Sequence, residues 1–373
     1  EDVDGGSDFG RISLQEMATR LCGSADLFAT EPGRGAPASI NFVSCHDGFT
    51  LTDLTRYRSK HNEANGENNN DGSSVNHSAN FGVEGVTDDP DVIAAREQAA
   101  MNMIGMLLLS LGTPMMLAGD EFRNTQDGNN NAYCQDNDIT WLKWDWMYST
   151  NKTREMRRLE TVSRLVALRK SLDLYHHEDF FTRLTQIGLL KPSSRVQWFL
   201  PDGTTPMERD WFDLGVRSFT MRLLSNSEVD VCIVVNGTAD DRTFRLPPDT
   251  HWTPKWCSAE INGRRAGHGT QVEECDLNGD TTVWTQHVPD ASETVLKMVE
   301  EVAMQRTESS TENEADTIKF AMPVTDHAAN GTSSAPRDEV SADMPDAPVD
   351  DTPDTPVDDN VWTMPALSIT LMK

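Results

Sequence analysis

Positive charge is the property that this 373-residue chain has least of. Only 32 Lys and Arg side chains accompany 60 Asp and Glu side chains, which leaves a formal net charge of −28 at pH 7. A chain this acidic repels the phosphates of nucleic acids and the headgroups of anionic membranes. The composition therefore argues against nucleic acid and membrane surfaces as partners.

Clustered cysteines and long apolar runs are missing too. The six cysteines stand singly, without a C-x-x-C pair or a spacing typical of zinc sites, so we expect free thiols and neither a metal nor a cofactor. The most apolar stretch, Met101 to Leu111, is shorter than the roughly 20 apolar residues that span a bilayer. No signal peptide opens the chain, and the acidic, glycine-rich start at Glu1 suggests that the natural N-terminus lies further upstream. We expect a cytoplasmic protein.

The length allows two domains. In the first part, residues 39–43 form a short β-rich run that ends at His46-Asp47. A polar loop follows over about residues 60–87, rich in Asn, Gly and Asp. This loop is longer than ordinary connections in compact domains, and such loops often carry function.

Helix and strand signals then alternate. Asp89 and Pro90 are typical of a helix start, and apolar positions continue to Gly112 as a stop signal. Residues 114–118 are all apolar and predict a strand buried on both faces. After an Asn-rich loop, apolar periodicity predicts an amphipathic helix over about residues 156–171. This order is typical of βα repeats.

The pattern changes after residue 172 to short β-type runs separated by turns. Residues 196–200, 219–223 and 231–235 predict strands of a separate antiparallel β domain. Residues 300–360 carry 16 acidic against 3 basic residues and Pro-rich near-repeats, so we expect disorder there. The last residues alternate again, with Leu367, Ile369 and Leu371 on one face, so we expect the acidic segment to be an insertion before a final strand.

His46 and Asp47 are the first candidates for chemistry. A carboxylate beside an imidazole can hold sugar hydroxyls and stabilise a developing positive charge. The dipeptide alone is a weak signal, because positions without a function outnumber catalytic ones. Its surroundings strengthen it.

Five segments in order carry a resemblance to a known family. They are INFVSCHDGFTL at 40–51, KHNEANGEN at 60–68, FGVEG at 81–85, GTPMMLAGDEF at 112–122 and GNNNAYCQDN at 128–137. Together they resemble the isoamylase and glycogen-debranching branch of the α-amylase superfamily, glycoside hydrolase family 13. The first resembles the fourth signature region of that superfamily, and the resemblance extends over about residues 10–290.

The resemblance implies an α/β fold. Residues 1–172 would be the C-terminal part of a TIM (β/α)8 barrel, and residues 173–299 an antiparallel β-sandwich domain. The disordered acidic insertion would occupy residues 300–360, and residues 361–373 would return as the final strand of the sandwich.

The resemblance also implies a retaining hydrolase that acts on α-1,6 branch linkages of glycogen or another branched α-glucan. Asp47 matches the acidic residue that stabilises the oxocarbenium-like transition state, and His46 matches its substrate-binding neighbour. Tyr133 and Asp136 either line the substrate groove or hold the loop that carries them.

The nucleophilic Asp and the acid/base Glu of the family lie on earlier barrel strands, in motifs that this sequence does not contain. Retaining chemistry needs those two carboxyl groups roughly 5–5.5 Å apart. We therefore expect the chain by itself not to hydrolyse a glycosidic bond. Two hypotheses stay open: part of a debranching hydrolase, or a non-catalytic glucan-binding or regulatory truncated homologue.

Other conspicuous residues have ordinary explanations. The side chains of Asp120 and Glu121 diverge because the residues are adjacent, so a structural role is favoured over a catalytic pair. Residues 127–131 lack the spacing of a calcium-binding EF-hand. Trp141, Trp144 and Trp146 are interpreted as packing residues, because aromatics spaced in this way after a strand more often pack than bind a ligand.

Overall fold

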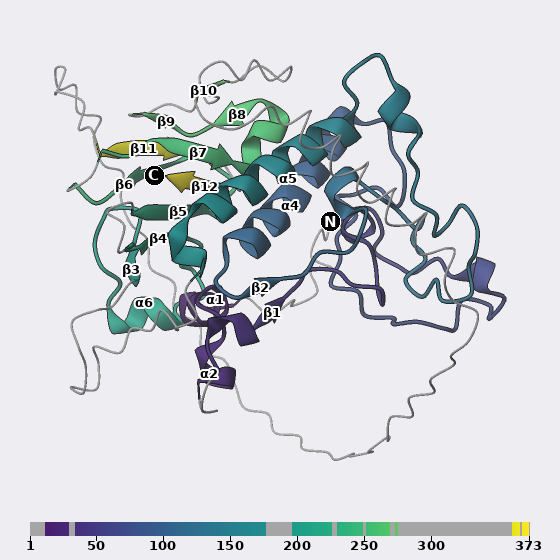
Figure 1. Cartoon of the computed structure of the whole chain (residues 1–373), viewed down its shortest axis with the longest axis horizontal. Coiled ribbons are helices and arrows are strands. Elements are labelled where there is room, and N and C mark those ends of the chain that lie inside the picture. Colours follow the sequence, from purple (N-terminus) through teal and green to yellow (C-terminus); the bar gives the residue numbers. More distant parts are fainter. Residues whose placement is uncertain are drawn as a thin grey trace, which may run out of the picture. The chain divides into compact units, whose positions relative to one another are not determined.

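The computed structural model describes residues 12–29, 34–176, 196–225, 230–248, 251–268, 273–274, 360–365 and 368–372 (Figure 1). The α-helices are α1 (Leu14–Leu21), α2 (Ala25–Phe28), α3 (Leu51–Leu54), α4 (Pro90–Leu109), α5 (Arg154–Ser171) and α6 (Glu208–Phe212). The short 3-10 helices are η1 (Ala36–Ala38), η2 (Glu63–Asn65), η3 (Asp120–Phe122), η4 (Asp145–Tyr148), η5 (Asp173–His176) and η7 (Ser258–Asn262). The strands are β1 (Ile40–Asn41), β2 (Thr113–Pro114), β3 (Val196–Phe199), β4 (Ser218–Leu223), β5 (Val231–Asn236), β6 (Arg242–Arg245), β7 (Pro254–Cys257), β8 (Arg264–Arg265), β9 (Gly267–His268), β10 (Glu273–Glu274), β11 (Val361–Met364) and β12 (Ser368–Met372).

The two long helices begin at the capping residues that their sequences supply. The Asp89 carboxylate accepts hydrogen bonds from the N–H groups of Asp91 and Val92, and Pro90 occupies the first helical turn of α4. The Thr153 hydroxyl accepts from the Met156 N–H and caps α5. Both predicted helices are confirmed.

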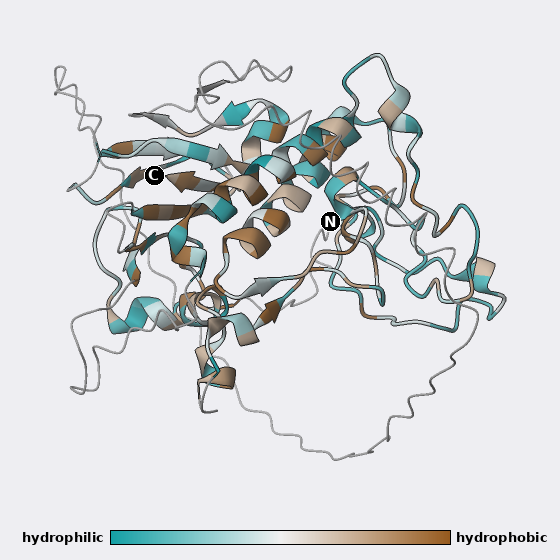
Figure 2. Ribbon diagram, in the orientation of Figure 1, coloured by the Kyte–Doolittle hydropathy of each residue, from teal (hydrophilic) through white to brown (hydrophobic). Residues whose placement is uncertain are grey.

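Helix α4 is 20 residues long, and by length and composition alone it could cross a membrane. Half of its most apolar stretch is buried inside the protein, and the buried set includes the charged residues Arg96 and Glu97. A core helix of a globular protein has the same properties. In Figure 2, α4 shows much brown, as do the neighbouring strands β5 and β12.

The main sheet is antiparallel and has the strand order β3-β4-β5-β12-β7. Strands β3, β4 and β5 confirm the three strands that the sequence predicts there. The C-terminal strand β12 lies between β5 and β7, with Ile369 paired to Val235 and Leu371 to both Ile233 and Trp256. The last residues of the chain therefore complete the middle of this sheet.

Alternating side chains place this sheet between two hydrophobic clusters. Ile233, Leu371 and Trp256 belong to the cluster shared with α1, α4 and α5. Cys232 and Val234, which point the other way along β5, belong to a second cluster with residues of the three-stranded sheet β6-β11-β9. The two antiparallel sheets thus enclose a core between them.

The expected barrel portion is not seen. Within the described ranges the one parallel pairing joins β1 to β2, with Ile40 opposite Thr113 and Asn41 opposite Pro114. The part of the chain that the structure describes is a mixed α/β structure with an antiparallel sheet and no closed barrel.

The prediction for residues 114–118 was wrong. Strand β2 ends at Pro114, and Met115 is 40% exposed rather than buried. The reason is that only one face of this segment meets the core: Met116 packs against the core, while Met115 is exposed. The residues after the paired strand β1 behave in the same way, with Val43 packed against the core and Phe42 exposed. Residues 300–359 lie outside the described residues, so the disorder expected there stays a prediction.

Candidate functional site

His46 and Asp47 lie in the turn that follows β1, as the sequence predicts. Their side chains are 87% and 81% exposed, and His46 Nε2 lies 3.5 Å from Asp47 Oδ2. A polar contact this exposed adds little to stability, because water competes for both groups. Both side chains are therefore accessible to a ligand without loss of an important internal contact.

A buried carboxylate, Asp120, holds the two ends of this turn. Its Oδ2 accepts a hydrogen bond from the Ser44 hydroxyl, and its Oδ1 accepts from the Leu51 N–H at 2.9 Å. Asp120 is 1% exposed, and burial raises its pKa to about 6. The neighbouring Glu121 accepts from the Gly119 N–H at 2.8 Å. These contacts agree with the structural role favoured for both carboxylates.

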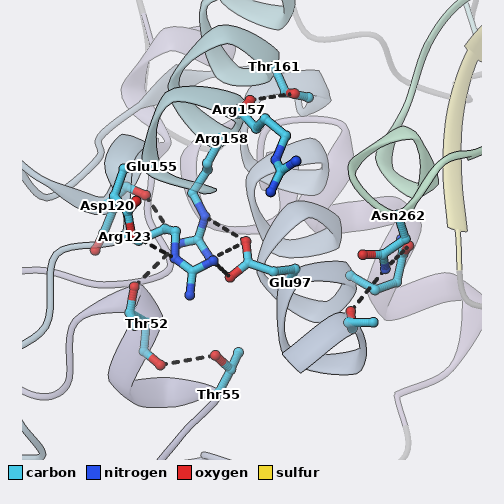
Figure 3. A network of polar contacts seen from close by, with 12 residues as sticks. Thr52, Thr55, Glu97, Asp120, Arg123, Glu155, Arg157, Arg158, Thr161 and Asn262 are labelled. Carbon is cyan, nitrogen blue, oxygen red and sulfur yellow. Dashed lines mark hydrogen bonds and ion pairs between the residues drawn. The ribbon is translucent and has the colours of Figure 1, made fainter. Parts of the chain in front are cut away.

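A buried charge network adjoins Asp120, and the sequence pattern did not predict it (Figure 3). Arg158 donates three hydrogen bonds to the Glu97 carboxylate, two from Nη2 at 2.8 and 2.9 Å and one from Nε at 3.2 Å. Arg123 Nη1 lies 2.7 Å from Glu97 Oε1. Arg158 also donates to the Thr52 hydroxyl at 3.3 Å. Burial opposes the charge on Glu97, but Arg158 and Arg123 outweigh it and hold the pKa of Glu97 below its usual value. Charged residues inside apolar helical stretches are the signal that could have revealed this network.

The two Asn-rich loops are joined by their amides. Asn62 and Asn130 are both buried: the Asn62 amide donates to the Asn130 side-chain oxygen at 2.9 Å, and the Asn130 N–H donates to the Asn62 side-chain oxygen at 3.0 Å. The Asn65 amide donates to the Asn131 carbonyl at 2.9 Å. The Gly48 N–H donates to the Asn130 carbonyl at 3.0 Å. The loop at residues 127–138 is thereby fixed beside the turn that carries Asp47.

The longer loop is also anchored to helix α4. The Glu84 carboxylate accepts from the N–H groups of Arg58 and Ser59. Burial opposes its charge, but these and other hydrogen bonds outweigh burial and lower the pKa of Glu84 to about 2. Arg96 of α4 donates to the carbonyls of Gly85 and Asn80. The asparagines and Glu84 are therefore structural. Within the described residues, no group of three or more His, Cys, Asp and Glu side chains is arranged to hold a metal ion.

Tyr133 and Asp136 belong to the loop fixed beside the turn, and both side chains are exposed. Asp136 Oδ1 accepts a hydrogen bond from the indole N–H of Trp141 at 2.9 Å. The structure thus brings the two segments that carry the four predicted site residues together through the Gly48–Asn130 hydrogen bond. The role of each residue stays a prediction.

Comparison with known proteins identifies the family. No family model matches the chain. It is 45% identical over 210 residues to the glycogen operon protein GlgX homologue of Mycobacterium tuberculosis, which covers 56% of this chain and 28% of the relative. It is 38% identical over 270 residues to the glycogen debranching enzyme of Pectobacterium atrosepticum, which covers 72% of this chain and 38% of the relative. The chain thus spans only about a third of the length of these relatives.

Among solved structures, the chain superimposes in part on the pullulanase from Bacillus acidopullulyticus. The TM-score is 0.40 and the identity 18%, over 65% of this chain and 23% of that chain. This superposition is too weak to define a shared fold.

The sequence relatives place the chain in the α-amylase superfamily, glycoside hydrolase family 13. Within that superfamily, the chain is a homologue of the GlgX-type glycogen debranching enzymes.

Proposed function

We propose that this chain forms one side of the active site of a retaining glycoside hydrolase that removes α-1,6 branches from glycogen-like glucans in the cytoplasm. Asp47 stabilises the transition state, and His46, Tyr133 and Asp136 bind the substrate. The observation that carries the proposal is the exposed Asp47 carboxylate, placed on a turn whose two ends are fixed by the buried Asp120.

The chemistry of the reaction explains why a fixed carboxylate matters. Positive charge develops on the sugar ring as the glycosidic bond breaks, and a carboxylate already held in place stabilises that charge without having to reorganise. Hydrolysis also needs a nucleophile and a proton donor, roughly 5–5.5 Å apart in retaining enzymes. In the family that the chain resembles, both residues lie in motifs that precede the matched segments. The proposal therefore assigns this chain the role of stabilising and binding, not of nucleophilic attack.

A chimera tests this assignment. It joins the part of the Pectobacterium atrosepticum enzyme that precedes the matched region to this chain. We expect the chimera to release linear chains from glycogen, and the chain alone to release none. Asp47→Asn in the chimera should lower kcat by about 10²–10³, the usual effect of removing one group that stabilises transition-state charge. The exposed Asp88→Asn is the matched control and should leave the rate unchanged.

Equal rates for the chimera and its Asp47→Asn variant would remove Asp47 from the proposed role. A folded chimera that binds glycogen without releasing any chains would instead favour the non-catalytic glucan-binding homologue.

A further inference from the structure

The three tryptophans that follow the second Asn-rich loop have different surroundings. Trp144 and Trp146 are half-buried, and their ring centroids lie 4.7 and 5.4 Å from that of Phe122. Trp141 lies outside this cluster and is 56% exposed. The interpretation as packing residues therefore suits Trp144 and Trp146 but leaves Trp141 unexplained.

The exposed ring of Trp141 is nevertheless held in one orientation. Its indole N–H donates to Asp136 Oδ1 at 2.9 Å, and its backbone N–H donates to the Asn137 carbonyl at 3.0 Å. Fixing a large side chain costs conformational entropy, and a ring that stays mostly in water gains little hydrophobic energy in return. An exposed but oriented aromatic ring is therefore better explained by a ligand than by folding.

Trp141 is also tied to the proposed catalytic turn through a chain of hydrogen bonds. The Thr140 hydroxyl donates to the Gln135 carbonyl at 3.0 Å, and the Gln135 amide donates to Asn65 at 2.7 Å. The same loop receives the hydrogen bond from the Gly48 N–H, next to Asp47. The ring is thus carried by a segment fixed relative to that turn.

We propose that Trp141 is a stacking surface for a glucose unit of the bound glucan and that Asp136 is the residue that positions it. The C–H groups on one face of a glucose ring are apolar, and they pack on the flat face of an indole. This inference narrows the substrate-binding role proposed above for Asp136: one of its carboxylate oxygens already binds the indole N–H, so Asp136 acts on the sugar through Trp141. This inference rests on the proposed function, since it takes an α-glucan as the ligand.

To test this, the 373-residue chain is titrated with maltohexaose, and binding is measured by calorimetry and by tryptophan fluorescence. Trp141→Ala should weaken binding by about tenfold or more, as truncation of a central aromatic contact does. It should also remove most of the fluorescence change, although the other eight of the nine tryptophans remain. Tyr148→Ala, which removes another exposed aromatic ring, is the matched control and should bind as the unchanged chain does.

A second set of variants tests the positioning role of Asp136. Asp136→Asn keeps an oxygen that accepts from the indole N–H and should bind maltohexaose nearly as well as the unchanged chain. Asp136→Ala removes that oxygen and should weaken binding, but it should have no further effect in a chain that already carries Trp141→Ala. Circular dichroism establishes that each variant is folded.

Each remaining outcome overturns a part of this inference. Equal affinity of the Trp141→Ala variant and the unchanged chain would overturn the stacking role while leaving the proposed function intact. A further loss from Asp136→Ala in the Trp141→Ala background would show that Asp136 contacts the sugar directly, which overturns the positioning role. No binding of maltohexaose or glycogen by the unchanged chain would overturn both this inference and the proposed function.

Discussion

Asp120 is the single residue on which the placement of the His46-Asp47 turn depends most. It accepts one hydrogen bond from each end of the turn and is almost fully buried. Burial raises its pKa from the usual 3.8 to about 6. In the folded chain this carboxyl therefore keeps its proton at pH values where the unfolded chain has already lost it. Stability from this group is fully present below about pH 4 and is lost as the pH rises through about 6.

Because the stabilisation by Asp120 falls as the pH rises, a variant that does not titrate should behave differently from the unchanged chain. At about 1.4 kcal/mol per pH unit, the loss between about pH 4 and pH 6 is on the order of 3 kcal/mol. Asp120→Asn keeps an acceptor for the Leu51 N–H but does not titrate, so it should be more stable than the unchanged chain at about pH 7.5 and similar to it at about pH 4. Urea unfolding across this range measures the difference.

Asp120→Ala separates hydrogen bonding from charge. It leaves the Leu51 N–H and the Ser44 hydroxyl without this partner and should cost about 1–3 kcal/mol even where Asp120 is protonated. The exposed Asp88→Asn should change nothing. A pH profile of the Asp120→Asn variant identical to that of the unchanged chain would mean that Asp120 does not control this part of the pH dependence.

At the scale of elements, the contact between α4 and the sheet depends on Gly105. A methyl group at Gly105 would meet two ring carbons of Trp256, at 2.9 and 3.0 Å. Helix propensity alone would make Gly105→Ala stabilising by about 1 kcal/mol. The Trp256 ring is completely buried, so there is no open space into which it can shift, and overpacking costs about 1–3 kcal/mol. The cost of overpacking should exceed the gain in helix propensity, so we expect a net loss of stability.

Thermal and urea unfolding of the Gly105→Ala variant measure this balance. The double variant with Trp256→Leu is the control: without the large ring, the change at Gly105 should become neutral or stabilising. Stabilisation by Gly105→Ala in the otherwise unchanged chain would contradict the close approach of α4 to the Trp256 ring.

Local signals explain which elements were predictable. Asp89 and Thr153 lie beside the helices that they cap, so the sequence predicts where α4 and α5 begin. The contacts that shape the candidate site are not local: Asn62 and Asn130 are 68 residues apart, and Glu97 and Arg158 are 61 apart. Through the family resemblance, the sequence predicts the turn that carries His46 and Asp47. It predicts neither these two pairs of partners nor the separation of Trp141 from the other two tryptophans.

At the scale of the whole molecule, the net charge of −28 remains the dominant property. Mutual repulsion of excess like charges destabilises a compact state. The distance over which such charges interact falls from about 30 Å at 0.01 M salt to about 10 Å at 0.1 M. Added salt should therefore relieve the repulsion, whereas a buried pair such as Glu97 and Arg158 is screened much less.

The third prediction is a rise in melting temperature with sodium chloride at neutral pH. Between about 0.01 and 0.1 M we expect a rise of about 1–2 °C, which corresponds to roughly 1 kcal/mol at an unfolding entropy of about 2.1 cal/mol/K per residue. Scanning calorimetry measures it. The effect should shrink as the pH approaches the isoelectric point of about 4.5, because the excess charge disappears there. A melting temperature that falls with salt at neutral pH would mean that exposed attractive pairs such as Arg20 and Asp26 outweigh the net repulsion.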